Sequence, residues 1–218
     1  MQRERIYRVL LDSEWQLDDL YEFPQAFAKS YAFIYCLDSE LAPRDRERIN
    51  RALAEYPWRG GFSYVNINTV LHNQVPVHDR PRIRSIQYAS PGWLDLFLNV
   101  DVAIQVAKSV GVLLGAAGSA ALTYKGIYKT LASIKVEREK AKLQTMQLTQ
   151  AQAKVVLSLC DDMAKFLGFK NVKELHQFTG NPETSMKLLA AHYRRTKILT
   201  EFVEKGKAEL PSAEYDNG

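Results

Sequence analysis

The sequence has few of the cysteine and histidine residues that form disulfide-linked folds or cysteine-based metal sites. Among its 218 residues there are only two cysteines and four histidines. Cys36 and Cys160 lie far apart in apolar surroundings, and neither has a second cysteine or a histidine at metal-ligand spacing. We therefore predict two buried thiols in a reducing compartment. A disulfide framework is not expected.

Local signatures of catalysis are also missing. The sequence contains no GxxxxGK(S/T), GxGxxG, GxSxG, HExxH or CxxC pattern, the usual marks of phosphate, dinucleotide, acyl-transfer and zinc chemistry. His72 and His78 share one segment with Asp79 but have no further ligand-type side chain beside them, so surface or structural roles are expected for them. The sequence thus predicts a protein that is not an enzyme and holds no cofactor or metal.

A strong charge of one sign is absent as well. The chain has 29 Lys+Arg against 25 Asp+Glu, and a net charge of +4 does not by itself indicate nucleic-acid binding. Arg194 and Arg195 in the C-terminal region are candidate phosphate contacts, although acidic residues lie close by. Arg80, Arg82 and Arg84 alternate at the start of a predicted strand. They are candidate contacts for an anionic ligand or an acidic partner, or else charges that protect a sheet edge.

Residues 1–92 show both strand and helix patterns and are predicted to form a small α+β domain. Residues 6–11 favour a strand, and Ser13 with Gln16 indicates a helix start, with the helix continuing to about residue 37. Pro24 is expected to kink or split this helix, whose apolar and aromatic side chains are predicted to form core. A second helix is expected from Pro43 to before Pro57.

Two strands and a junction complete this predicted domain. Residues 62–71 and 82–89 alternate in polarity and are predicted to pair as antiparallel strands after a turn at Gly60 and Gly61. The sequence Ser-Pro-Gly at residues 90–92 is typical of a strand-to-helix junction, with serine as the helix cap.

The rest of the chain is predicted to be mainly helical, which makes the fold class α+β. The sequence contains no proline between residues 93 and 152. Residues 93–150 are therefore expected to form one long helix or a helix pair broken near its glycines. Residues 151–210 are expected to hold helices near 151–167 and 172–178 and a last helix ending near 205. Residues 211–218 are predicted to be a flexible tail.

One segment of the predicted long helix differs from all others. Residues 109–124 form a run of sixteen without a charge, between Lys108 and Lys125, and many of them are glycine, alanine or serine. Spanning a bilayer takes about twenty apolar residues. Extending the run to Leu94 gives the length but includes Asp95 and Asp101.

The glycines of this segment recur at helical spacing and predict a contact surface. Glycine is costly in a helix interior, so several glycines on one side of a helix indicate close approach of another backbone. The predicted interface residues are Gly111, Gly115, Gly118, Ser119 and Leu122. A basic stretch follows, with Lys125, Lys129, Lys135, Arg138 and Lys142 as its predicted basic surface.

These features predict a non-enzymatic interaction or assembly protein that self-associates, or docks on a protein partner, through the Gly/Ala-rich helix. One alternative is a membrane-anchored or membrane-perturbing effector in which residues 94–124 insert and the small domain senses a signal. A second is nucleic-acid binding by the C-terminal helices. The protein is expected to be cytoplasmic and bacterial in style, with membrane association as an alternative, and no cleaved secretion signal is expected.

Overall fold

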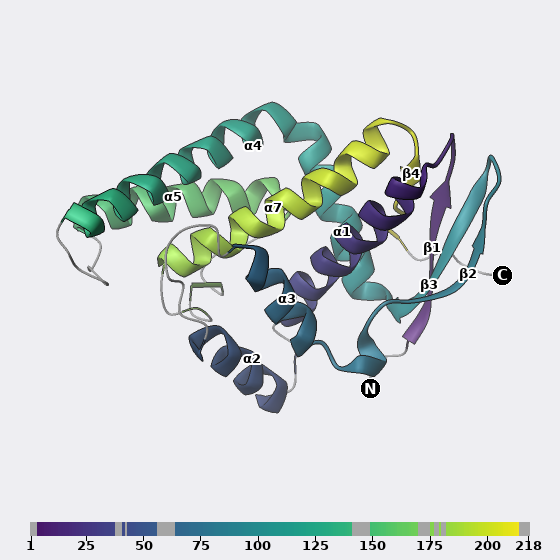
Figure 1. Cartoon of the computed structure of the whole chain (residues 1–218), viewed down its shortest axis with the longest axis horizontal. Coiled ribbons are helices and arrows are strands. Elements are labelled where there is room, and N and C mark those ends of the chain that lie inside the picture. The colour runs from purple at the N-terminus through teal and green to yellow at the C-terminus, as the bar shows by residue number, and fades with distance from the viewer. Residues whose placement is uncertain are drawn as a thin grey trace.

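A computed structural model describes residues 4–37, 41, 43–55, 64–140, 149–169, 175–176, 179 and 182–213. The described elements confirm the predicted α+β class, with one small sheet and several helices (Figure 1). In chain order they are β1 (Glu4–Leu11), α1 (Leu17–Cys36), α2 (Pro43–Glu55), α3 (Tyr64–Gln74), the short 3-10 helix η1 (Val77–Asp79), β2 (Arg82–Gln87), β3 (Gly92–Asn99), α4 (Val100–Lys140), α5 (Gln150–Phe166), α7 (Pro182–Glu204) and β4 (Ala208–Glu209).

The four strands form an antiparallel sheet in the order β2-β3-β1-β4. β1 pairs with β3 along its whole length, from Glu4 opposite Asn99 to Leu11 opposite Gly92. Alternate side chains of these two strands are buried against the helices, as the period of two in a strand requires. They are Tyr7, Val9, Leu11, Leu94, Leu96 and Leu98. The helices therefore cover one face of the sheet, which lies at one end of the molecule in Figure 1.

The prediction of a strand over residues 62–71 was wrong, because residues 64–74 form helix α3. The buried side chains Ile67, Val70, Leu71 and Val75 are spaced by three, one and four residues, and this spacing places them on one side of a helix that packs against α1. The predicted turn at Gly60 and Gly61 lies outside the described residues.

The predicted strand-to-helix junction at residues 90–92 was also wrong. Ser90 and Pro91 lie in the turn of a β-hairpin, and Gly92 is the first residue of β3, a central strand instead of the start of a helix. A Cβ atom at Gly92 would lie 2.4 Å from the carbonyl oxygen of Gln87, so only glycine fits this turn. The helix begins at Val100, where the Asn99 side chain accepts a hydrogen bond from the amide of Asp101 at 3.0 Å.

Helix α1 confirms the predicted aromatic core but not its predicted start. The helix begins at Leu17, where the carboxylate of Asp19 accepts a hydrogen bond from the Gln16 amide at 2.8 Å. Ser13 adopts a positive φ of 60° and does not cap it. The helix continues through Pro24 and is not split there. Its buried aromatic side chains are Phe23, Phe27, Tyr31, Phe33 and Tyr35.

Helices α4, α5 and α7 pack against one another, and α4 is one continuous helix of 41 residues through all of its glycines. α5 and α7 confirm the two long helices predicted after residue 150, and Gly168 ends α5 with a φ of 75°. The predicted helix over 172–178 lies mostly outside the described residues, as does the tail beyond residue 213. The two-residue strand β4, which follows α7, was not predicted. The division of the chain into domains at residue 92 stays a prediction.

Candidate functional site

The five predicted interface residues all lie on the solvent-exposed side of α4. Gly111, Gly115, Gly118 and Ser119 are exposed, and Leu122 is 73% exposed. We call these five residues the glycine face. A Cβ atom added at any of the three glycines would meet no atom of another residue within 4 Å. The chain's own described fold therefore does not use the small size of these glycines.

The opposite side of α4 is the packed one. Its buried side chains, among them Val106, Val110, Leu113 and Ile127, contact the core beneath the sheet and the cluster shared with α5 and α7. The glycine at position 126 behaves differently from the glycine face, because a Cβ atom there would lie 3.2 Å from Cδ2 of Leu159 on α5. Within the described residues, Gly126 therefore has a packing neighbour in the chain, and Gly111, Gly115 and Gly118 do not.

The glycine face is charge-free but has lysines at both ends. Lys108 precedes it, and Lys125, Lys129 and Lys135 follow it along α4 with exposed side chains. Arg138 lies within α4, and its side chain is not among those described, whereas Lys142 lies outside the described residues. The described part of the predicted basic surface is therefore solvent-facing.

Helix α4 is also long and apolar enough to cross a membrane. Residues Val100–Glu137 contain an 18-residue window with a mean hydropathy of 1.5, of which 44% is buried inside the fold. The buried share belongs to the packed side of α4. By length and composition alone, the helix is compatible with membrane association and equally with a core helix of a soluble protein.

The three predicted anion contacts have different surroundings. Arg80 lies before β2, and its Nε donates to the carbonyl oxygen of Val75 at 3.0 Å. The guanidinium of Arg82 lies 5.1 Å from the centre of the Phe97 ring. Arg84 lies at the irregularity of the β2–β3 pairing. A role for these residues in binding anions stays a prediction.

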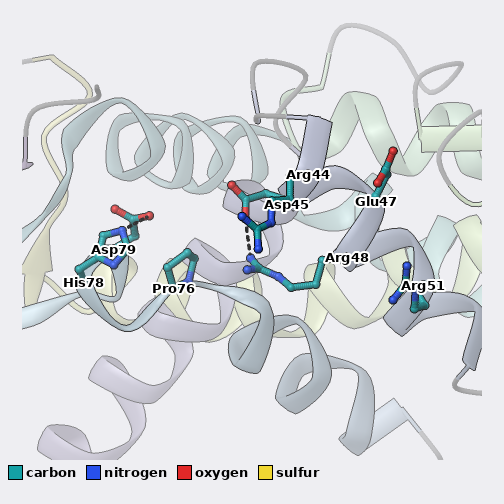
Figure 2. Close-up of a pocket in the computed structure, with 8 residues that line it drawn as sticks. All are labelled: Arg44, Asp45, Glu47, Arg48, Arg51, Pro76, His78 and Asp79. Atoms are coloured by element: carbon teal, nitrogen blue, oxygen red, sulfur yellow. Dashed lines mark ion pairs between the residues drawn. The ribbon is translucent and has the colours of Figure 1, made fainter.

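A pocket that the sequence did not predict lies between α2 and the segment around η1 (Figure 2). It has a volume of about 660 Å³, and its lining residues are Arg44, Asp45, Glu47, Arg48, Arg51, Pro76, His78 and Asp79. In the sequence, the spacing of Arg44, Arg48 and Arg51 by four and three residues indicates that they share one side of a helix, and this signal could have predicted part of the lining.

The charges of this pocket are largely compensated within it. A guanidinium nitrogen of Arg48 lies 3.0 Å from a carboxylate oxygen of Asp45 and donates to the carbonyl oxygen of Gln74 at 2.8 Å. The hydroxyl of Tyr35 donates to the Asp79 carboxylate at 2.7 Å, and burial, followed by this hydrogen bond, raises the pKa of Tyr35. Three arginines and three acidic side chains line the pocket, so the lining gives no excess charge that would select a ligand.

His192 is buried, and His72 and Arg195 are partly buried. His192 is fully buried, and its ring stacks on Phe33 with 4.1 Å between ring centres. Burial lowers the pKa of His72 and of Arg195. Among the described residues, no group of three or more His, Cys, Asp or Glu side chains could hold a metal ion. Nucleic-acid binding through Arg194 and Arg195 stays a prediction.

No protein-family model, curated protein or solved structure matches the chain. The function must therefore be inferred from the chain's own surface.

Proposed function

We propose that the chain is a non-enzymatic assembly protein that binds a second copy of itself through the glycine face of α4. One observation carries the proposal. Gly111, Gly115 and Gly118 each lower helix stability by about 0.8–1 kcal/mol relative to alanine, yet no neighbouring atom in the described fold requires their small size. A helix partner outside the described chain is the simplest physical reason for three glycines on one exposed side.

The composition of the face fits a contact between two helices. Small side chains let two backbones approach closely, and the partly exposed Val112 and the exposed Leu122 supply apolar side chains beside them. Lys108 and Lys125 limit the contact to the charge-free part between them. Because the same surface is present on each copy, a two-fold arrangement pairs it with itself.

Substituting Gly115 tests this proposal without damaging the fold. Because a Cβ at this position meets open space, Gly115→Ala should raise the free energy of unfolding of the isolated chain by up to about 1 kcal/mol. Gly115→Leu should leave the chain folded but separate the two backbones, weakening self-association roughly tenfold or more. Thermal unfolding at low concentration and sedimentation equilibrium over a range of concentrations measure the two effects.

Ser158→Leu is the matched control, since Ser158 is exposed on α5 away from the glycine face. It adds the same side chain to a helix surface and should not change association. A chain that is monomeric at all concentrations, or whose association is equally sensitive to both substitutions, would contradict self-association through α4.

A second candidate is association with an anionic membrane surface, which the length and hydropathy of α4 favour. Full insertion of residues 94–124 would remove β3 from the centre of the sheet and strip the packed side of α4, so we propose a shallow contact of the exposed side. Leu122 would enter the lipid boundary, with Lys125 and Lys129 near the headgroups.

Flotation with vesicles of phosphatidylcholine and phosphatidylserine distinguishes the two candidates. Membrane contact predicts that the chain floats at low salt, that Leu122→Ser reduces flotation, and that the equally apolar exposed control Leu17→Ser on α1 does not. Gly115→Leu separates the mechanisms most sharply. It adds apolar surface and should strengthen vesicle binding, whereas it should weaken self-association.

A further inference from the structure

The sheet has an open edge at β2, on the side away from β1. In the described part of the chain, β2 pairs only with β3, and its other edge has no strand beside it. All six residues of β2 are exposed, and Figure 1 shows the strand at the margin of the molecule, away from the helices. Such an edge offers backbone N–H and C=O groups to an incoming strand.

Two large apolar side chains of β2 lie on the helix-facing side of the sheet, but the helices do not cover them. Ile83 pairs with Leu96 and Ile86 with Leu94, and both leucines point into the core. The irregularity at Arg84 makes this possible, because residues three apart would otherwise lie on opposite faces. Ile83 is nevertheless 58% exposed and Ile86 50% exposed. A strand added beside β2 would cover both side chains.

The charge of this edge identifies the kind of strand that fits. Residues 80–88 contain three arginines and no Asp or Glu. The nearest acid across the pairing, Asp95, is already held by Arg8 at 2.7 Å and by the Ser85 hydroxyl at 3.1 Å, and these contacts keep its pKa below the usual value. A second copy of β2 would bring three further arginines to the same place, which is unfavourable.

We infer that β2 binds an extended acidic segment of a partner protein, which adds as a fifth strand to the sheet. Its acidic side chains would lie near Arg82 and Arg84, and its apolar side chains would cover Ile83 and Ile86. Arginines and an irregular pairing also protect an edge against uncontrolled pairing. The exposed isoleucines distinguish this edge from a purely protective one, since protection is better served by polar residues at those positions.

The test uses the full chain and a labelled ten-residue peptide that alternates glutamate and valine. Two comparison peptides separate charge from strand addition: one has lysine in place of glutamate, and one keeps the glutamates but has proline in place of alternate valines, which removes backbone donors. We expect fluorescence anisotropy to show binding of the first peptide at least tenfold tighter than either comparison peptide. Amide hydrogen exchange should slow in residues 82–87.

Two variants of the chain locate the contact. Ile86→Thr and Arg84→Glu should each weaken peptide binding roughly fivefold or more. Their matched controls lie on α5: Val155→Thr alters a side chain that is 49% exposed, and Lys154→Glu reverses an exposed charge, and neither should change binding. Thermal unfolding confirms that all four variants are folded.

Several results would overturn the inference. Equal binding of the proline peptide would mean that charge alone attracts the ligand. Exchange protection in α4 instead of β2 would assign the peptide to the glycine face. Protection of residues 82–87 that grows with protein concentration and needs no peptide would identify a second copy as the occupant of the edge.

Discussion

Glu183→Ala is expected to lower the free energy of unfolding by about 3–5 kcal/mol, a large effect for the loss of a single charged side chain. The Nζ atom of Lys187 lies 2.6 Å from a carboxylate oxygen of Glu183 one helical turn away, and the two side chains are only 7% and 9% exposed. Removing the carboxylate takes away the 2.6 Å counter-charge of the Lys187 ammonium group in a site that little water can enter. Denaturant unfolding followed by circular dichroism measures the change.

Helix α7 supplies its own control for this prediction. Lys197 and Glu201 form an ion pair at the same spacing, but their side chains are 55% and 42% exposed. Glu201→Ala should therefore cost no more than about 0.5 kcal/mol. The double variant Glu183→Leu with Lys187→Met should recover most of the stability, because it removes both buried charges. Similar losses for Glu183→Ala and Glu201→Ala would show that burial of the first pair has no energetic consequence.

The helices with clear apolar periodicity could be predicted from sequence because their buried residues are local and repeat over several turns. The second helix begins at Pro43 as predicted, and the helix predicted near residues 151–167 is α5, which ends just before Gly168. Short apolar segments were not predictable in the same way. Residues 64–74 fit both a period of two and a helical spacing, and only packing of α3 against α1 decides between them.

The central strand β3 was missed for a different reason. The sequence Ser-Pro-Gly at residues 90–92 was interpreted as a helix start, and Asp95 and Asn99 interrupt the apolar pattern of a strand, but both are buried in the sheet. Arg8 on β1, far away in the sequence, binds the Asp95 carboxylate. The Asn99 side chain caps α4 by accepting a hydrogen bond from the backbone amide of Asp101 at 3.0 Å, and the Tyr31 hydroxyl accepts one from the backbone N–H of Asn99 at 3.2 Å. A sequence window cannot show which remote residue compensates a buried polar group.

The glycine face was predictable as a set of residues, but its exposure was not. The spacing of Gly111, Gly115 and Gly118 places them on one helix side whatever surrounds the helix. Whether that side is buried is decided by α5 and α7, which follow later in the chain and pack on the opposite side of α4. The pocket beside α2 and the open edge of β2 likewise depend on how segments distant in sequence come together.

The stability of the chain should also depend on pH through His192. This side chain is fully buried, its ring stacks on Phe33, and burial lowers its pKa from 6.5 to about 3. The unfolded chain therefore binds a proton at this residue between pH 6.5 and pH 3, whereas the folded chain does not. Stability from this group is fully present above pH 6.5 and is lost as the pH falls towards 3, at up to about 1.4 kcal/mol per pH unit.

We expect the free energy of unfolding to fall by about 2.5 kcal/mol between pH 7 and pH 4.5 through His192 alone. His192→Leu should remove this part of the pH dependence, leaving the smaller contributions of His72 and His176, whose pKa values burial also lowers. His78→Asn is the control, because the side chain of His78 is 78% exposed. Denaturant unfolding at several pH values gives the slopes. If His192→Leu and the unsubstituted chain lose stability in parallel as the pH falls, the buried ring is not held neutral by the fold.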